Sequence, residues 1–359
     1  MSRQKHLVID ARMLHASGIG TYLQALLPRL PSRLPDVRFT LMMPEDKPSI
    51  PQYERVPLAA GVYSPTEQAA LFRAIPSDAD LVWSPHVNVP VVSRKRLLVT
   101  IHDAFYMDAE WSRTTRLDKR VYLAAMMRAI TLRAAAVLTV SHFTADELVS
   151  KLHTLKAPVT VVHNGVDPVW LNPPAGESPC DRPYVVAVGN LKPHKNLHAL
   201  VTAFARIADE VPHDLVLVGR AEGFAGGSGL AQAAIRRLGS RLRFTGHVPF
   251  DSLRSWVYHA DLMAFVSLYE GFGLPPLEAM ASGTPVLASR AASIPEVCGD
   301  AAAFCNARDP EDLASSLRDL LHDPERRAQL VAAGRERIKA FDWDRSADET
   351  AVVIRSLLL

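Results

Sequence analysis

Residues 267–280 read SLYEGFGLPPLEAM, an order of residue types that predicts a strand end, a turn and a helix. The two glycines suit a tight turn, and Pro275 and Pro276 suit a first helical turn, where a missing N–H costs nothing. Glu278 would then lie in or near that turn, where the helix dipole stabilises a carboxylate. Glu270 precedes the turn and has no such structural explanation. We therefore interpret the stretch as a strand-to-helix junction that also binds a ligand.

Short apolar runs and helical patterns alternate along the chain on both sides of this junction. The strands expected in the first half are 6–11, 38–43, 80–85, 96–103, 136–141 and 159–164. Those expected in the second half are 184–189, 214–219, 241–246, 261–268, 284–289 and 302–305. Apolar strands separated by helices predict α/β units whose parallel sheets are buried on both faces.

A stretch with five prolines at 167–184 separates the two series of strands and is typical of a linker. We therefore predict two doubly wound domains, at 1–170 and 184–340. A cleft is expected between them at the carboxyl ends of the strands, where open α/β sheets bind their ligands.

The formal net charge of the 359-residue chain is +2, which favours neither a nucleic-acid partner nor an acidic one. The charge is unevenly distributed, because residues 1–173 hold 20 Lys and Arg against 15 Asp and Glu. The surplus lies at 113–133, where Asp118 is accompanied by Arg113, Arg116, Lys119, Arg120, Arg128 and Arg133. Two interpretations remain open, a helix with a solvated basic side and a basic amphipathic face that meets anionic lipid.

Three cysteines without metal-ligand or redox spacing are typical of a reducing compartment. The first residues run directly into a strand pattern, so a signal peptide is not expected. The longest apolar stretch, near 121–140, contains Arg128 and Arg133, which argues against a transmembrane helix. We expect a cytoplasmic protein that is soluble or peripheral on the inner face of a membrane.

The loops after the first half's strands hold three candidate ligand-binding residues. Gly18 and Gly20 would let the backbone approach a ligand closely before a helix begins, although glycine turns that open helices are ordinary. The third glycine of a dinucleotide fingerprint is missing, which disfavours a nicotinamide enzyme. His102 ends the strand at 96–103 and is expected to exchange a proton near neutral pH. Alternatively, it is a histidine capped by the neighbouring Asp103.

The loop at 188–197, VGNLKPHKNL, places three potential cations just before a helix that Asn196 is positioned to cap. Lys192, His194 and Lys195 beside a helix N-terminus predict an anion site that suits a diphosphate. The alternative is a solvated loop. The acidic side chains and open amides of 270–278 suit sugar hydroxyls, because a hydroxyl both donates and accepts hydrogen bonds.

Nearly the whole chain resembles the retaining glycosyltransferases of family 4, which have the GT-B architecture of two Rossmann-like domains around a deep cleft. The most specific element is EGFGLPPLEAMASGTPV at 270–286, which is similar to the family's E-x7-E motif. The supporting segments are SGIGTY (17–22), TIHD (100–103), TVSHFT (139–144), HNGVD (163–167), VGNLKPHKNL (188–197), SIPEVCGDAA (293–302) and FDWDRSADETAVVI (341–354). The last resembles the family's final helix, so residues 341–359 are expected to cross back onto the N-terminal domain.

The resemblance implies roles for individual residues, without a metal or another cofactor. Glu278 would hold the ribose of a nucleotide sugar, Glu270 would contact the transferred sugar, and Lys195 would neutralise the departing diphosphate. His102, the third residue with an implied catalytic role besides Glu270 and Lys195, would lie beside the transferred sugar. Gly18 and Gly20 would let the N-terminal loop close over the phosphates or the acceptor. The further residues that would contact the donor are His194, Val248, Phe272, Gly273 and Leu274. The family usually carries arginine where His194 stands, so activity is expected to fall as pH rises unless another cation, such as Lys192, substitutes.

The runs at 188–197 and 270–280 are most similar to a bacterial mannosyltransferase-like subgroup that acts on surface polysaccharides. This resemblance implies retaining transfer of a sugar, GDP-linked mannose first, to a lipid-linked or growing glycan such as lipopolysaccharide. The basic stretch 113–133 would then contact the inner membrane surface or an anionic lipid diphosphate. The open alternatives are a UDP-linked donor, a nucleotide-sugar epimerase and a binding protein of the same fold without turnover.

Overall fold

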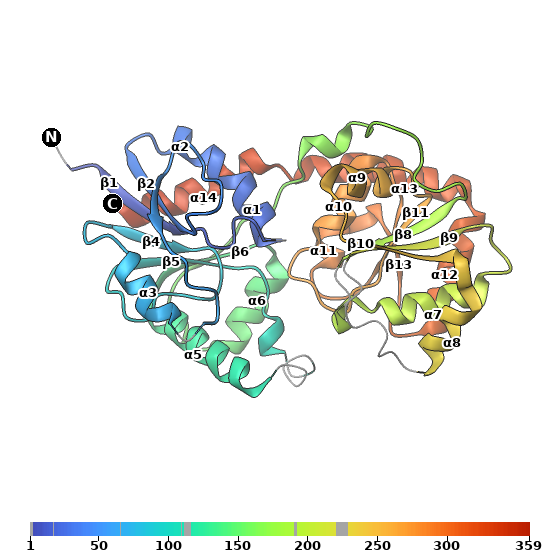
Figure 1. The fold of residues 1–359 in the computed structure, drawn as a ribbon, viewed down its shortest axis with the longest axis horizontal. Helices are drawn as coiled ribbons and strands as arrows, with labels where there is room; N and C mark the ends of the chain where they lie inside the picture. The colour runs from blue at the N-terminus through green and yellow to red at the C-terminus, as the bar shows by residue number, and fades with distance from the viewer. Residues whose placement is uncertain are drawn as a thin grey trace. The chain divides into compact units, whose positions relative to one another are not determined.

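The computed structural model describes residues 3–16, 18–64, 66–108, 110, 116–189, 192–219 and 229–359. The chain divides into two compact units. Unit 1 consists of Met1–Gly165 with Asp342–Leu359, and unit 2 consists of Val166–Phe341. Each unit is a three-layer structure in which helices cover both faces of one sheet (Figure 1).

The sheet of unit 1 has seven parallel strands in the order β3-β2-β1-β4-β5-β6-β7. The strands are β1 (Lys5–Asp10), β2 (Val37–Met43), β3 (Glu54–Pro57), β4 (Leu81–Ser84), β5 (Arg96–Ile101), β6 (Ala134–Thr139) and β7 (Val159–Val161). The central strand β1 is completely buried from Leu7 to Ile9 because helices cover both faces of the sheet. The direction in which the strands are added reverses between β1 and β4, which is the topological switch point of this sheet.

Helices α1, α2 and α14 cover one face of this sheet, and α3, α5 and α6 cover the other (Figure 1). The helical segments are α1 (Ile19–Leu26), η1 (Leu27–Arg29), α2 (Leu30–Arg33), α3 (Glu67–Ala74), η2 (Phe105–Met107), α5 (Leu117–Arg133), α6 (His142–Lys151) and α14 (Trp343–Leu358). Leu71 of α3 and Ile130 of α5 belong to one hydrophobic cluster with strand residues such as Val8 and Val99.

The sheet of unit 2 has six parallel strands in the order β10-β9-β8-β11-β12-β13. The strands are β8 (Tyr184–Val188), β9 (Asp214–Val218), β10 (Leu242–Gly246), β11 (Leu262–Phe265), β12 (Val286–Ser289) and β13 (Ala303–Cys305). The switch point of this sheet lies between β8 and β11.

Helices α7, α8 and α12 cover one face of the second sheet, and α9, α10 and α13 cover the other (Figure 1). The helical segments are η3 (Pro168–Leu171), η4 (Pro193–Lys195), α7 (Leu197–Ile207), α8 (Gly229–Leu238), η6 (Gly239–Arg241), α9 (Phe250–Tyr258), α10 (Leu274–Ser282), α11 (Ile294–Cys298), η7 (Gly299–Ala301), α12 (Pro310–His322), α13 (Pro324–Arg337) and η8 (Ile338–Ala340). Phe204 of α7 and Leu317 of α12 pack with Leu217 of β9 in the main core.

The predicted α/β class with two doubly wound domains is confirmed, and each of the twelve predicted strands has a counterpart. Sequence reasoning missed β3, whose four residues ERVP form an edge strand with little burial. A short edge strand needs no apolar pattern because only one side of it is paired. In the apolar stretch near 121–140, α5 ends at Arg133 and β6 begins at Ala134. No helix in the described part of the chain is long and apolar enough to cross a membrane.

The proline-rich stretch at 167–184, predicted as a linker, is part of unit 2. Trp170 is 2 % exposed, and its ring lies 5.6 Å from that of Phe250 in an edge-to-face arrangement. The guanidinium group of Arg254 donates to the carbonyl oxygens of Val169 and Asn172 at 2.7 and 2.8 Å. The stretch therefore packs against α9, although its residues lack the periodicity of a core element.

The C-terminal helix α14 belongs to unit 1, where buried and charged contacts hold it. The hydroxyl of Ser346 donates to the carbonyl oxygen of His163 at 2.6 Å. Arg33 forms ion pairs with Asp344 at 2.9 Å and Asp348 at 2.5 Å. At the start of the helix, Gly165 is so close to Trp343 that an added Cβ would lie 2.3 Å from the backbone nitrogen of Trp343.

We predict that Gly165→Ala lowers the free energy of unfolding by at least about 2 kcal/mol, because backbone atoms must shift to admit the methyl group. Urea unfolding followed by far-UV circular dichroism measures the change. The control is Gly61→Ala, since a Cβ at this exposed position of unit 1 meets nothing within 4 Å. Equal stability of the two variants would contradict the packing of α14 described above.

Candidate functional site

Lys195 and Glu270 form a charged pair at the switch point of unit 2. Lys195 follows β8 and Glu270 follows β11, the two neighbouring strands at which the sheet order reverses. The ammonium group of Lys195 donates to Glu270 Oε1 at 2.5 Å, and the two side chains are 19 % and 14 % exposed. The helices that follow these loops, α7 and α10, lie on opposite faces of the sheet (Figure 1). Loops that diverge in this way leave a crevice that suits a ligand.

The loop that carries Lys195 is held by backbone geometry and by a side chain. Asn196 has a left-handed conformation, with φ at 56°, and its amide donates to the carbonyl oxygen of Ala307 at 2.7 Å. Asn196 therefore occupies the cap position of α7 without capping it through its side chain, in contrast to the prediction. The backbone N–H of Leu268 donates to the carbonyl oxygen of His194 at 2.7 Å, which joins this loop to the segment after β11. Residues 190 and 191 of the predicted loop lie outside the described residues.

The turn at 270–273 is braced by Ser293, a residue to which sequence reasoning gave no role. Ser293 is completely buried, and its hydroxyl lies 2.9 Å from the carbonyl oxygens of both Glu270 and Phe272, to which it donates. Gly273 has φ at 104°, a conformation that favours glycine, and it precedes the first residue of α10. In the sequence, Ser293 belongs to the segment at 293–302, which resembles the family but does not by itself indicate that Ser293 supports this turn.

Backbone donors at the start of α10 lie beside this turn. Pro275 and Pro276 occupy the first helical turn, as predicted, and carry no N–H groups. The amides of Gly273 and Leu274 donate to no residue in the described part of unit 2. Phe272 is 5 % exposed, and its ring packs 5.7 Å from that of Phe341. Gly273 and Leu274 are thus the predicted contacts whose amides are best placed for a ligand.

Glu278 lies in the second turn of α10, because the helix begins at Leu274. Glu278 is the fifth residue of the helix, so it lies next to the first turn, in agreement with the prediction that it lies in or near that turn. Burial, with a smaller effect from Asp167, raises the pKa of the Glu278 carboxyl group to about 7. No described residue forms a hydrogen bond or an ion pair with this carboxyl group. A partly buried carboxyl group without a protein partner is suited to bind hydroxyl groups of a ligand.

His194 is not a third cation of this site at neutral pH. Burial, followed by the positive charge of Lys195, lowers the pKa of His194 to about 4. The expectation of a phosphate partner whose charge changes near neutral pH is therefore wrong for the ligand-free protein. Lys195 and the exposed Lys192 supply the positive charge of this loop.

The predicted proton donor of unit 1, His102, is also neutral at pH 7. Burial lowers its pKa to about 4, and its Nε2 atom lies 3.0 Å from the carbonyl oxygen of Pro85. Its ring packs edge-to-face against Tyr22, with 4.8 Å between the ring centroids. His102 is therefore a hydrogen-bond donor at the carboxyl end of β5, without the proton exchange near neutral pH that we expected.

The glycines before α1 serve two different purposes. Gly18 has φ at 68° and open space around its Cα, so its backbone conformation explains the glycine. At Gly20 an added Cβ would lie 3.0 Å from the carbonyl oxygen of Leu14 and 3.1 Å from that of Met13. Gly20 therefore allows a close approach of the chain to itself, which gives it a structural function. Ser17 lies outside the described residues.

Val248, the remaining predicted contact, is partly buried in the loop between β10 and α9 of unit 2. It follows the carboxyl end of the outermost strand, two strands away from β8. Unit 2 thus contains Lys195, His194, Val248, Phe272, Gly273, Leu274, Glu270 and Glu278, whereas Gly18, Gly20 and His102 belong to unit 1.

Comparisons with known proteins identify the family to which the chain belongs. Residues 16–170 match the family model described as "Glycosyltransferase Family 4", and residues 170–337 match "Glycosyl transferases group 1". The chain belongs to the family 4 glycosyltransferases. The E-x7-E segment, with Glu270 and Glu278, lies within the second matched region.

Two curated relatives illustrate the relationship. The MMP α-(1→4)-mannosyltransferase of Mycolicibacterium hassiacum is 29 % identical over 271 residues, which are 72 % of this chain and 64 % of that protein. An O-antigen chain mannosyltransferase of Salmonella typhimurium is 26 % identical over 269 residues, covering 74 % of this chain and 70 % of that protein. The match to the first relative thus spans less than two thirds of its length.

A solved structure supports the fold. Sucrose-phosphate synthase from Thermosynechococcus elongatus superposes with a TM-score of 0.79 over 99 % of both chains, at 22 % identity. The chain therefore shares the GT-B fold.

We predict that Glu278→Gln stabilises the ligand-free protein increasingly as pH rises from about 4.5 to about 7. The raised pKa means that folding disfavours the ionised carboxylate, so the wild type loses stability as Glu278 ionises. Below pH 4.5 both side chains are neutral, and above pH 7 the difference becomes constant. Urea unfolding of both proteins at several pH values measures it. A difference that does not vary between pH 4.5 and 7 would contradict the raised pKa.

Proposed function

We propose that unit 2 binds a nucleotide sugar at the switch point between β8 and β11 and that the protein transfers the sugar to a glycan with retention of configuration. The observation that carries this proposal is the Lys195–Glu270 pair beside the amides of Gly273 and Leu274. A diphosphate needs a fixed cation and backbone donors, and a sugar needs groups that accept from its hydroxyls.

The chemistry divides between these groups. Lys195 Nζ has three donors, one of which is used by Glu270, so it can contact a diphosphate without losing that partner. Glu270 then orients hydroxyls of the transferred sugar, and Glu278 accepts from the ribose. As the bond from the anomeric carbon to the phosphate oxygen breaks, Lys195 stabilises the charge that develops on the leaving group. An acceptor hydroxyl attacks from the same face, and the departing phosphate takes its proton. We propose that no metal ion takes part.

Mannose is the sugar that we favour, with GDP as the nucleotide. The relatives named above are mannosyltransferases, one of them of an O-antigen chain. We propose that the acceptor is likewise a lipid-linked or growing surface glycan. A panel of GDP-, UDP- and ADP-linked sugars tests the donor, because the best substrate identifies both base and sugar.

We predict that Lys195→Ala and Glu278→Ala each reduce turnover at least about tenfold, a loss of about 1.4 kcal/mol of transition-state stabilisation. Transfer from the best nucleotide sugar to a mannan or O-antigen oligosaccharide is the measurement. The matched control is Lys339→Ala, an exposed lysine of unit 2 whose partner is Glu336. Full activity in both site variants would overturn the proposed donor site.

We also propose that α5 contacts an anionic lipid surface or the diphosphate of a lipid-linked acceptor. A groove of about 660 Å³ runs along this helix, with Arg120, Arg128 and Lys151 among its lining residues. Leu117 and Val121 line it as well and are 71 % and 62 % exposed. Exposed apolar side chains beside arginines are the pattern of a helix that lies in a membrane interface.

Three of the remaining basic residues of 113–133 have partners within the protein. Lys119 donates to the hydroxyl of Tyr106 at 3.1 Å, and Arg133 donates to the carbonyl oxygen of Pro90 at 2.9 Å. Arg116 pairs with Asp118 at 3.2 Å. Arg113 lies outside the described residues. Arg120 and Arg128 are thus the residues that carry the proposed lipid contact.

We predict that the double variant Arg120→Ser/Arg128→Ser binds vesicles containing 30 % phosphatidylserine at least about tenfold more weakly than the wild type, since each arginine near an anionic surface contributes about 1 kcal/mol. Vesicle flotation measures the binding. The control is Arg236→Ser/Arg237→Ser on α8 of unit 2, which removes the same charge. If both double variants lose vesicle binding equally, the loss depends only on the net charge of the protein, which would contradict a specific contact by α5.

A further inference from the structure

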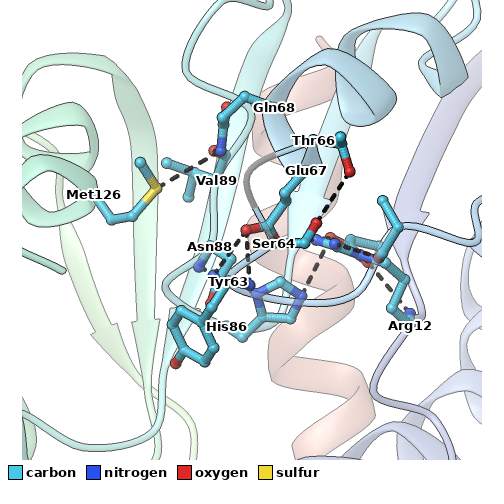
Figure 2. A network of polar contacts seen from close by, with 12 residues as sticks. Arg12, Tyr63, Ser64, Thr66, Glu67, Gln68, His86, Asn88, Val89 and Met126 are labelled. Carbon is cyan, nitrogen blue, oxygen red and sulfur yellow. Dashed lines mark hydrogen bonds and ion pairs between the residues drawn. The ribbon is translucent and has the colours of Figure 1, made fainter. Parts of the chain in front are cut away.

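A buried network of charged groups fills the switch point of unit 1. Asp10 at the end of β1 lies 2.6 Å from Arg12 and 3.2 Å from His86, which follows β4. Arg12 also pairs with Glu67 of α3 at 2.8 Å. Figure 2 shows Arg12 and His86 beside Glu67, with Asn88 next to them. Buried charges are stable only when paired, so this network fixes the groups that it joins.

The network holds the loop between β3 and α3 at both of its ends. Arg12 donates to the carbonyl oxygen of Ala60 at 3.1 Å. At the other end, Glu67 accepts from the backbone N–H of Tyr63 at 3.0 Å and from the hydroxyl of Tyr122 at 2.5 Å. Figure 2 shows Tyr63 and Glu67 joined in this way. The loop is therefore tied to the sheet by Arg12 and Glu67, whose side chains are 3 % and 0 % exposed.

Tyr63, a residue of this loop, has an unfavourable backbone conformation and a partly exposed ring. Its φ is 68°, a conformation that aromatic residues rarely adopt, and its side chain is 41 % exposed. The fold thus maintains a strained backbone position for a ring that stays partly exposed. Strain of this kind persists where the surrounding structure over-determines it, and it concentrates at binding sites.

Two aromatic rings and a cation lie together at this place. Lys119 Nζ lies 4.7 Å from the centroid of the Tyr63 ring and 4.9 Å from that of Tyr106. Tyr122 packs edge-to-face against Tyr63 at 5.5 Å, which holds the Tyr63 ring in its orientation. Asp103, an exposed residue after β5, accepts from the backbone N–H of Phe105, the residue before Tyr106, at 3.1 Å. The cluster lies at the carboxyl edge of the sheet, where ligands of such sheets bind.

We propose that Tyr63, Tyr106, Lys119 and Asp103 form a carbohydrate-binding subsite of unit 1 that accepts an uncharged pyranose unit of the glycan acceptor. This inference rests on the proposed function, because it identifies where unit 1 binds the acceptor. An aromatic ring offers an apolar face for the C–H groups of a sugar ring. Lys119 donates to sugar hydroxyls, and Asp103 accepts from them. The charge network is the support that holds the loop of Tyr63 in place.

Saturation-transfer difference NMR tests the subsite with three probes, the methyl α-glycosides of mannose, glucose and galactose. We expect transfer to the ring protons of at least one glycoside with the wild-type protein. Tyr63→Gly removes the ring and relieves the positive φ, and we expect it to reduce the signal about fivefold or more. Tyr63→Phe keeps the ring, and Phe72→Ala removes an exposed ring on α3, so both should retain the signal. Should Tyr63→Gly fail to fold, Tyr63→Asn takes its place, because asparagine tolerates positive φ.

The outcomes separate this inference from the proposed function. Absence of transfer from all three glycosides, or a Tyr63→Gly signal equal to that of the wild type, overturns the subsite. The same samples are tested for a rise in Tm with the nucleotide-sugar panel, which reports the donor site of unit 2. A rise in Tm without glycoside binding leaves the proposed function intact and removes the subsite. Glycoside binding that depends on Tyr63, without a rise in Tm from any nucleotide sugar, supports the subsite and removes the proposed donor site.

Discussion

The ion pair between Lys195 and Glu270 is the interaction on which the candidate site of unit 2 depends. It joins the loops after β8 and β11, at the one place in the sheet where the chain turns to opposite faces. The attraction between two partly buried opposite charges offsets part of the cost of removing each from water. The pair therefore maintains a cation and a carboxylate side by side in a crevice, which is what a diphosphate linked to a sugar requires.

The switch points of the two sheets contain different sets of charged residues. In unit 2 the position between β8 and β11 holds the Lys195–Glu270 pair. In unit 1 the corresponding position between β1 and β4 is filled by Asp10 and His86, with Arg12 bridging to the next loop. The same architecture thus holds one ion pair at the switch point of unit 2 and a network of charged groups at that of unit 1.

The sequence was sufficient for the fold because periodicity is a local property. The central strands contain apolar runs, and the junction at 270–278 contains glycines and prolines. These patterns predict strands, turns and helix starts without information from distant residues. Sequence reasoning failed where tertiary contacts decide. Burial sets the pKa values of His102 and His194 well below neutrality, and no local pattern reveals how deeply a histidine lies. Ser293 supports the turn from 21 and 23 residues away, so spacing alone could not assign its function.

The crystal structure of the protein with GDP or UDP bound tests the central claim most directly. The account predicts that the diphosphate lies within hydrogen-bonding distance of Lys195 Nζ and of the amides of Gly273 and Leu274, with the ribose at Glu278. A nucleotide bound elsewhere on either unit, with Lys195 and Glu270 still in contact only with each other, would contradict it.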